Sequence, residues 1–177
     1  MLKRFVVLSL IAALLLPAAA DAATKKRSST RRSSSRASSG PTVSWWGPRL
    51  GISSSPDQFV IGGQLDFREV MPGMGFSPNI EFGFGDNVTW TAVNGDLKHH
   101  FMVRGSAWRP YLGGGLSMNF WNYSGQGGDA SGSEFGANLI LGAVVPTRQG
   151  SRFFTEARIG LGDIPDLKLM AGWNFRM

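Results

Sequence analysis

The last stretch of the chain, Asp166–Met177, constrains the fold most, because its side chains alternate strictly between two kinds. One set is apolar and aromatic: Leu167, Leu169, Ala171, Trp173, Phe175 and Met177. The other set is mixed: Lys168, Met170, Gly172, Asn174 and Arg176. Successive side chains leave a β-strand on opposite faces, so this alternation predicts a strand with one wholly apolar face. Such a strand is typical of the closing strand of a transmembrane β-barrel.

The same alternation recurs in seven earlier stretches, which are separated by segments that contain Gly, Pro, Ser or Asp. We expect these strands at residues 45–53, 59–67, 79–84, 87–103, 109–121, 135–145 and 153–162. A tilted strand needs about ten residues to cross the hydrocarbon layer. The sequence therefore predicts an all-β fold, an eight-stranded antiparallel up-and-down transmembrane β-barrel. Residues 68–75 are expected to form a turn, and 122–132 the one long loop, because that segment is glycine-rich and lacks apolar alternation.

The dipeptide Asn94-Gly95 leaves a choice between eight and nine strands, since Asn-Gly commonly forms a tight hairpin turn. The alternation continues through the dipeptide without a change of phase, from Thr91 and Val93 to Leu97. Single-chain bacterial barrels also have an even number of strands. We therefore expect one continuous strand here.

The N-terminal residues 1–22 are expected to be a signal peptide. Lys3 and Arg4 precede an apolar run at Phe5–Leu16, and Ala20-Asp21-Ala22 fits a small-x-small cleavage site. The run is too short to span a bilayer, and no other apolar run approaches eighteen residues. Any embedding in a membrane is therefore expected to use strands.

Residues 23–44 are expected to be a disordered basic tail that precedes the barrel domain, residues 45–177. The segment Thr24–Gly40 has six cations, seven serines and no acid, a composition that cannot bury a core. Residues 41–177 contain ten cations and eleven acids, a net charge of −1, so the basic pI comes from the tail. Behind a signal peptide we do not expect nucleic acid as the partner. The tail is either a soluble spacer or a contact with anionic lipid or peptidoglycan.

The polar face of the strands is predicted to point into the barrel and the apolar face toward lipid. A soluble lipocalin-like barrel would have the opposite arrangement. The polar phase is rich in glycine, which suits a crowded interior, and it carries both signs of charge, which suits enclosed ion pairs. The predicted interior charge network consists of Arg49, Asp66, Glu81, Asp96, Lys98, Glu156, Arg158, Lys168 and Arg176.

Aromatic residues near the strand ends predict girdles at the two bilayer interfaces, as in membrane barrels. With a periplasmic N-terminus, one rim is expected to hold Trp45, Trp46, Trp108, Trp173 and Phe175. Trp90 and Trp121 are expected at the other rim.

The barrel region resembles the small eight-stranded outer-membrane β-barrel domains of Gram-negative bacteria, the OmpA/OmpX-like and opacity-type superfamily. The resemblance is carried by RPYLGGGL at Arg109–Leu116, by FTEARIGLGD at Phe154–Asp163 and by the closing strand LKLMAGWNFRM. It implies a location in the cell outer membrane, contact with its lipids and assembly machinery, and a monomer. The terminal in-phase residue is Met177, where such proteins usually end in an aromatic. The resemblance brings no active site with it.

Neither a catalytic nor a metal nor a cofactor site is expected. The chain has no cysteine, and its only histidines, His99 and His100, are adjacent in a strand and so point to opposite faces. The glycines Gly113-Gly114-Gly115 lie within a strand, which is no place for a phosphate-binding loop.

The expected function is a non-enzymatic, structural role in envelope integrity, with the tail contacting anionic envelope components. The alternatives are a small-solute pore, a lipid-modifying barrel enzyme, and an adhesin that acts through loop 122–132. The pore is disfavoured because an eight-stranded barrel is only wide enough to be filled by its own side chains.

Overall fold

The computed structural model describes residues 43–85, 88–125, 128–147 and 150–177. The predicted signal peptide and nearly all of the basic tail lie outside the described residues. No described helix is long and apolar enough to cross a membrane.

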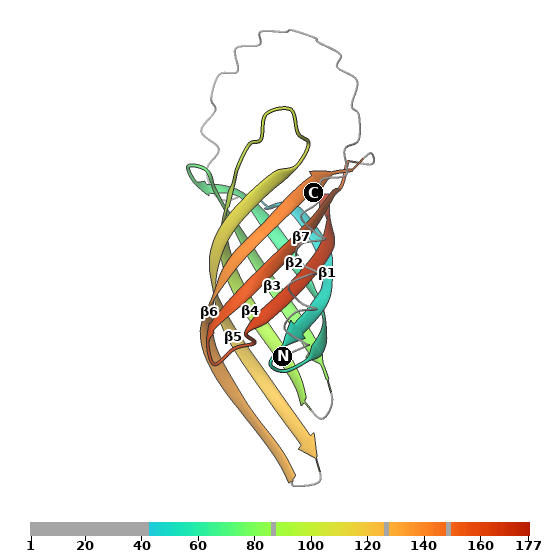
Figure 1. Cartoon of the computed structure of the whole chain (residues 1–177), viewed down its shortest axis with the longest axis vertical. Coiled ribbons are helices and arrows are strands. Elements are labelled where there is room, and N and C mark those ends of the chain that lie inside the picture. Colours follow the sequence, from blue (N-terminus) through green and yellow to red (C-terminus); the bar gives the residue numbers. More distant parts are fainter. Residues whose placement is uncertain (1–42, 86–87, 126–127, 148–149) are drawn as a thin grey trace, which may run out of the picture. The chain divides into compact units, whose positions relative to one another are not determined.

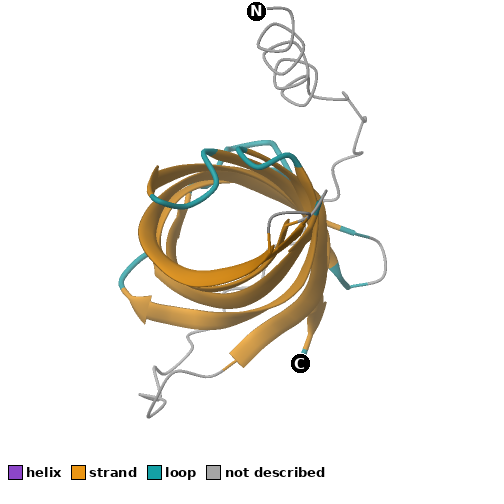
Figure 2. Ribbon diagram, turned by 90° about the horizontal axis from the view of Figure 1, so that it is seen from below, coloured by secondary structure: helices purple, strands orange, loops and turns teal. Residues whose placement is uncertain are grey.

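Eight strands form one sheet, and each strand pairs antiparallel with the next along the chain. They are β1 (Val43–Ser54), β2 (Gln58–Met71), β3 (Met74–Phe84), β4 (Val88–His100), β5 (Arg109–Gly125), β6 (Gly128–Pro146), β7 (Arg152–Gly162) and β8 (Leu167–Arg176). β1 also pairs with β8, for example Leu50 with Ala171, which closes the barrel. Figure 1 shows the tilted strands from the side, and Figure 2 shows the closed ring along the barrel axis. The predicted eight-stranded antiparallel barrel is confirmed.

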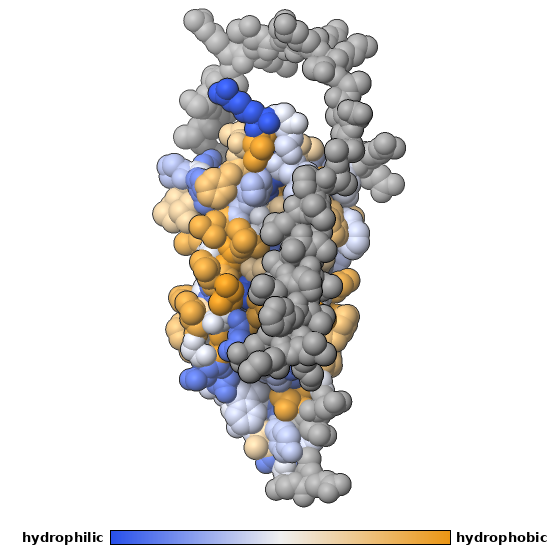
Figure 3. All heavy atoms as spheres, in the orientation of Figure 1, coloured by the Kyte–Doolittle hydropathy of each residue, from blue (hydrophilic) through white to orange (hydrophobic). Residues whose placement is uncertain are grey.

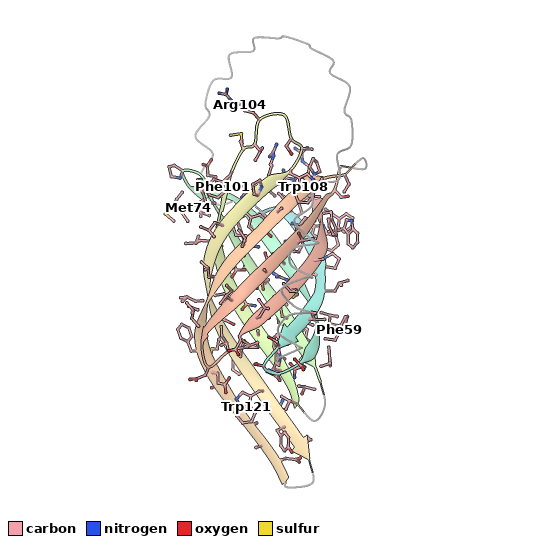
Figure 4. The ribbon with its side chains drawn as sticks, viewed as in Figure 1. Phe59, Met74, Phe101, Arg104, Trp108 and Trp121 are labelled. Atoms are coloured by element: carbon pink, nitrogen blue, oxygen red, sulfur yellow. The ribbon has the colours of Figure 1, made fainter. Side chains whose placement is uncertain are left out.

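The two ends of the barrel have different connections. One end, the terminal rim, holds the start of β1, the end of β8, the β4–β5 loop and two short turns. The opposite end, the hairpin end, lies where β1, β3, β5 and β7 end, and the described ends of β5 and β6 extend there beyond the neighbouring strands (Figure 1). Figure 4 places Arg104 and Trp108 at the terminal rim and Trp121 toward the hairpin end.

Side chains alternate between the interior and the outer surface as the sequence predicts, with the polar phase inside. In β4, the side chains of Asn94, Asp96 and Lys98 are buried inside the barrel. Val93, next to Asn94 along the strand, points outward and has an exposed fraction of 51%. The outer surface of the described strands carries large apolar side chains such as Leu50 and Leu139. On the face shown in Figure 3, hydrophobic residues gather along the middle of the strands. The polarity is thus inverted relative to a soluble barrel.

The glycines of the inward phase make room for large interior side chains. A Cβ at Gly172 would lie 2.7 Å from Cε1 of Phe154, and one at Gly142 would lie 2.5 Å from the hydroxyl oxygen of Tyr111. Both distances are shorter than a carbon atom tolerates, so the interior is filled to close packing at these points.

Asn94-Gly95 lies within continuous β4, whose register with both neighbours is unbroken there, so the single strand is confirmed. The predicted turn 68–75 is wrong in extent, because β2 continues to Met71 and β3 begins at Met74. The predicted strand 87–103 ends early, at His100.

The long loop predicted at 122–132 is wrong. β5 and β6 pair from Arg109 opposite Val144 to Gly125 opposite Gly128, so this segment is the end of a hairpin. Backbone hydrogen bonds hold such a ladder without apolar side chains. Where a hairpin extends beyond its neighbours, both faces meet polar surroundings, and the apolar alternation that revealed the other strands is absent.

The predicted aromatic girdle is correct in part. Trp46, Trp173 and Phe175 are exposed on the outer surface at the terminal rim, where Trp46 and Phe175 pack with ring centroids 5.6 Å apart. Trp108 lies half buried in the β4–β5 loop. Trp45 lies on the inward phase of β1, where Cζ of Arg152 is 3.7 Å from the centroid of its ring.

Trp90 and Trp121 do not belong to a lipid-facing girdle. Trp90 is only 5% exposed and packs inside the barrel against Val60, Ala92 and Met170, with Trp121 beside this cluster. The reason is the strand phase, since Trp90 shares the inward phase of Ala92. The outward aromatics of this end are phenylalanines: Phe59, Phe84, Phe120 and Phe135.

Candidate functional site

The middle of the barrel interior holds seven charged side chains that are almost completely buried. They come from β1, β3, β4, β7 and β8: Arg49, Glu81, Asp96, Lys98, Glu156, Arg158 and Lys168. The alternation of each strand places them inward, and we call them the interior charge network. All seven were predicted from the sequence to face the interior.

Glu156 is the most connected acid of the network. Its carboxylate accepts hydrogen bonds from Arg49, from Nε of Arg158 at 2.6 Å, and from Nζ of Lys98 at 2.9 Å. The hydroxyl of Tyr111 donates to Oε2 of the same carboxylate at 2.9 Å. Three cations and a phenol therefore depend on one side chain of β7.

Glu81 on β3 binds the fourth cation, Lys168, and together with Asp96 on β4 it shares the two arginines with Glu156. Nζ of Lys168 donates to Oε2 of Glu81 at 2.7 Å, and Arg158 is hydrogen-bonded to Asp96. Nε of Arg49 lies 3.3 Å from Oε1 of Glu81. These interactions link the three carboxylates through the two arginines into one network.

The network crosses the lumen. Lys98 on β4 reaches Glu156 on β7, and Lys168 on β8 reaches Glu81 on β3, although neither pair of strands is adjacent in the closed sheet. A buried ion pair is stable only when both charges are well paired. At this level the lumen is therefore spanned by charged side chains that pair with one another.

Two members of the predicted set lie apart from the network. Asp66 is half buried and accepts hydrogen bonds from Ser77 at 2.7 Å and from Asn174 at 2.8 Å. Arg176 is exposed at the terminal rim, one residue before the C-terminal Met177. Both follow the inward phase but lie too near the end of the barrel to be enclosed.

Four arginines of the described residues lie together at the terminal rim. Arg104, Arg109 and Arg176 are exposed there, and Arg152 is half buried. His99 and His100 also lie there, and their rings contact Phe101 and Tyr111, respectively. No group of three or more His, Cys, Asp or Glu side chains able to hold a metal ion occurs among the described residues.

A pocket of about 640 Å³ lies at the hairpin end, and sequence reasoning did not find it. We call it the mouth pocket. Its lining comes from the β1–β2 and β7–β8 turns and from the ends of β4, β5 and β6, and includes Trp90, Trp121, Tyr123, Glu134, Asp163 and Asp166. Inward phase could have indicated the two tryptophans and also Glu134, which shares the inward phase of Gly136 in β6. Asp163 and Asp166 lie on the β7–β8 turn, whose positions no alternation reveals.

No family model matches this chain, and a search of curated proteins found no match. Among solved structures, the chain is similar to the N-terminal β-barrel domain of Pseudomonas aeruginosa OprF, with 15% identity and a TM-score of 0.64; 78% of this chain and 100% of that chain are covered. It is also similar to Neisserial surface protein A (NspA), with 15% identity and a TM-score of 0.60, over 78% of this chain and 99% of that chain. At such identity the similarity shows the fold.

The shared fold and the inverted polarity together decide the class, because a closed barrel with an apolar outside and a charged inside is built for a bilayer. The chain is a small outer-membrane β-barrel. In this outer-membrane barrel, the outward apolar side chains meet lipid, and the interior charge network and the mouth pocket are the two candidate sites.

Proposed function

We propose that this outer-membrane barrel is a non-enzymatic structural protein of the cell envelope with a closed lumen. Its basic segment 24–40 contacts anionic envelope components on the periplasmic side. The observation that carries the proposal is the network across the lumen, in which every charge is paired and almost fully buried.

The network argues against a small-solute pore, since a conducting lumen would need its charges hydrated and separated. The positions of His99 and His100 argue against a lipid-modifying enzyme, because a base acting on surface lipid would be needed at the outer rim. With the termini in the periplasm, as the sequence predicts, the terminal rim that carries both histidines is the inner rim.

The terminal rim supports the proposed contact of the tail. The basic segment precedes β1, whose first residues lie at this rim, and the rim carries the exposed Arg104, Arg109 and Arg176. Each cation close to an anionic surface contributes about 1 kcal/mol, less under salt screening. The six cations of the tail and those of the rim would act on the same anionic layer.

A contact function is the second candidate, and the β5–β6 hairpin favours it. The described ends of β5 and β6 extend beyond the other strands (Figure 1). They expose the polar residues Asn122, Ser124, Asp129, Ser131 and Ser133. A paired hairpin presents these groups at lower conformational cost than a long loop would, which strengthens the adhesin alternative.

The structural role is tested in cells that lack the chain, by measuring their sensitivity to detergents and to dyes that an intact envelope excludes. We expect full-length chain to restore resistance and the chain without Thr24–Gly40 to restore it only in part. A matched control replaces the six cations of the tail by glutamine, which keeps its length. If this control binds isolated cell wall and anionic vesicles as well as the parent chain does, the tail is only a spacer.

A further inference from the structure

We propose that the mouth pocket binds an amphiphilic organic cation, a molecule with an apolar or aromatic body and an amine or quaternary ammonium group. This site goes beyond the structural role proposed above and does not depend on it. The pocket volume, about 640 Å³, lies within the range of pockets that hold small organic ligands.

The charge of the pocket selects a cation. Three carboxylates line it, Glu134 from β6 and Asp163 and Asp166 from the β7–β8 turn. The four segments that form the hairpin end, residues 54–58, 84–89, 120–135 and 160–167, contain no lysine or arginine in the sequence. Among the described residues, no cation is paired with Glu134, Asp163 or Asp166, and a bound cation would supply such a partner.

The walls of the pocket select an organic molecule over a metal ion. Trp90, Trp121 and Tyr123 line it together with apolar residues such as Ile164. Aromatic faces attract ammonium groups and pack against apolar bodies. Three carboxylates alone would attract any cation. The aromatic lining additionally favours a cation with an apolar body, because that body packs against the rings.

The two tryptophans that line the pocket are not equivalent. Nζ of Lys168 lies 5.1 Å from the ring centroid of Trp90 and occupies one face of that ring. Trp121 is therefore the ring that we assign to the ligand's ammonium group.

Lys168, which lies next to Trp90 beneath the mouth pocket, does not neutralise the negative charge of the pocket. Lys168 is paired with Glu81 at 2.7 Å, and the apolar cluster of Val60, Ala92, Trp90 and Met170 surrounds this part of the interior. The field in the mouth pocket is therefore set mainly by its own carboxylates.

The test is isothermal titration calorimetry of the full chain, folded in a neutral maltoside detergent, with benzyltrimethylammonium as the probe. Benzenesulfonate and benzyl alcohol serve as anionic and uncharged probes of similar size. We expect benzyltrimethylammonium to bind with an affinity that falls as salt is added, and the other two to bind at least about tenfold more weakly.

Variants locate the binding. Glu134→Gln and Asp163→Asn should each weaken binding of benzyltrimethylammonium by about twofold to fivefold, and Trp121→Leu by a similar factor. Asp129→Asn is the matched control, because Asp129 is an exposed acid of the same hairpin that does not line the pocket. Retained heat-modifiable migration on gels shows that each variant is folded.

The proposal is overturned if benzyltrimethylammonium does not bind, or if benzenesulfonate binds as well. It is also overturned if Asp129→Asn weakens binding as much as Asp163→Asn does, since the attraction would then be a general one to an acidic end. If Trp121→Leu does not fold, the two acid variants still decide the location.

Discussion

The middle of the barrel interior and the mouth pocket at the hairpin end differ in how their charged side chains are paired. In the middle, four cations and three carboxylates are buried and paired across the lumen. At the hairpin end, three acids line a pocket whose lining contains no lysine or arginine. The comparison separates a part whose charges are paired with one another from a part whose acids have no described cation beside them.

The largest effect is expected from Glu156→Ala, which removes the partner of Arg49, Lys98 and Arg158 at once. Leaving buried cations unpaired should lower the free energy of unfolding by about 3–5 kcal/mol. The free energy of unfolding is measured by urea titration of the barrel in lipid vesicles, with tryptophan fluorescence as the signal. Asp129→Ala on the exposed hairpin is the control and should change stability by less than about 0.5 kcal/mol. Equal effects of the two variants would erase the contrast between the regions.

A smaller loss is expected from Tyr111→Phe, which removes the phenolic hydrogen bond to Glu156 but leaves the three cations in place. A hydrogen bond to a charged group contributes about 1.5–3 kcal/mol, and the vacated carboxylate oxygen keeps its contact with Lys98. We expect the lower part of that range in the same urea titration. A loss as large as that of Glu156→Ala would mean that the phenolic hydrogen bond to Glu156, rather than its ion pairs, stabilises this level.

Lys98→Met should cost less, at most about 1 kcal/mol, because the network has one cation more than it has carboxylates. After the change, Arg49 and Arg158 still pair with Glu156, and methionine fills a similar volume. We therefore expect Lys98→Met to lower the free energy of unfolding less than Glu156→Ala does. If every ion pair contributed equally to stability, the two variants would lose similar amounts.

The smallest effect is expected from Asp163→Asn at the hairpin end. Asp163 is exposed and lies near other acids, so its loss relieves repulsion, and stability should change by less than about 0.5 kcal/mol in either direction. A loss above about 2 kcal/mol in the urea titration would show that the mouth is a structural part like the middle.

The fold could be predicted from the sequence because each membrane-crossing strand must show lipid one face and the lumen the other. This constraint fixed the eight strands, the continuity of β4 through Asn94-Gly95, and the burial of charges such as Arg158. It also assigns Trp90 to the interior, because Trp90 shares the phase of Ala92, whereas the position of Trp90 near the end of its strand, taken alone, predicts the girdle.

The constraint ends where the bilayer ends. Residues 122–125 pair with residues 128–131 although their side chains show no apolar alternation, because backbone hydrogen bonds alone hold the ladder. The acids of the β7–β8 turn at the mouth pocket, Asp163 and Asp166, were missed for the same reason, since no periodicity in the sequence records the geometry of a turn.

The central claim is that paired charges close the lumen, and planar-bilayer conductance of the purified full chain tests it most directly. We expect no steady single-channel steps from the parent chain at neutral pH, with an established porin in the same bilayers as the positive control. Glu156→Ala, if it still inserts, should show brief and irregular openings, because the freed cations no longer hold the plug together. Large, steady steps from the parent chain would contradict the closed lumen.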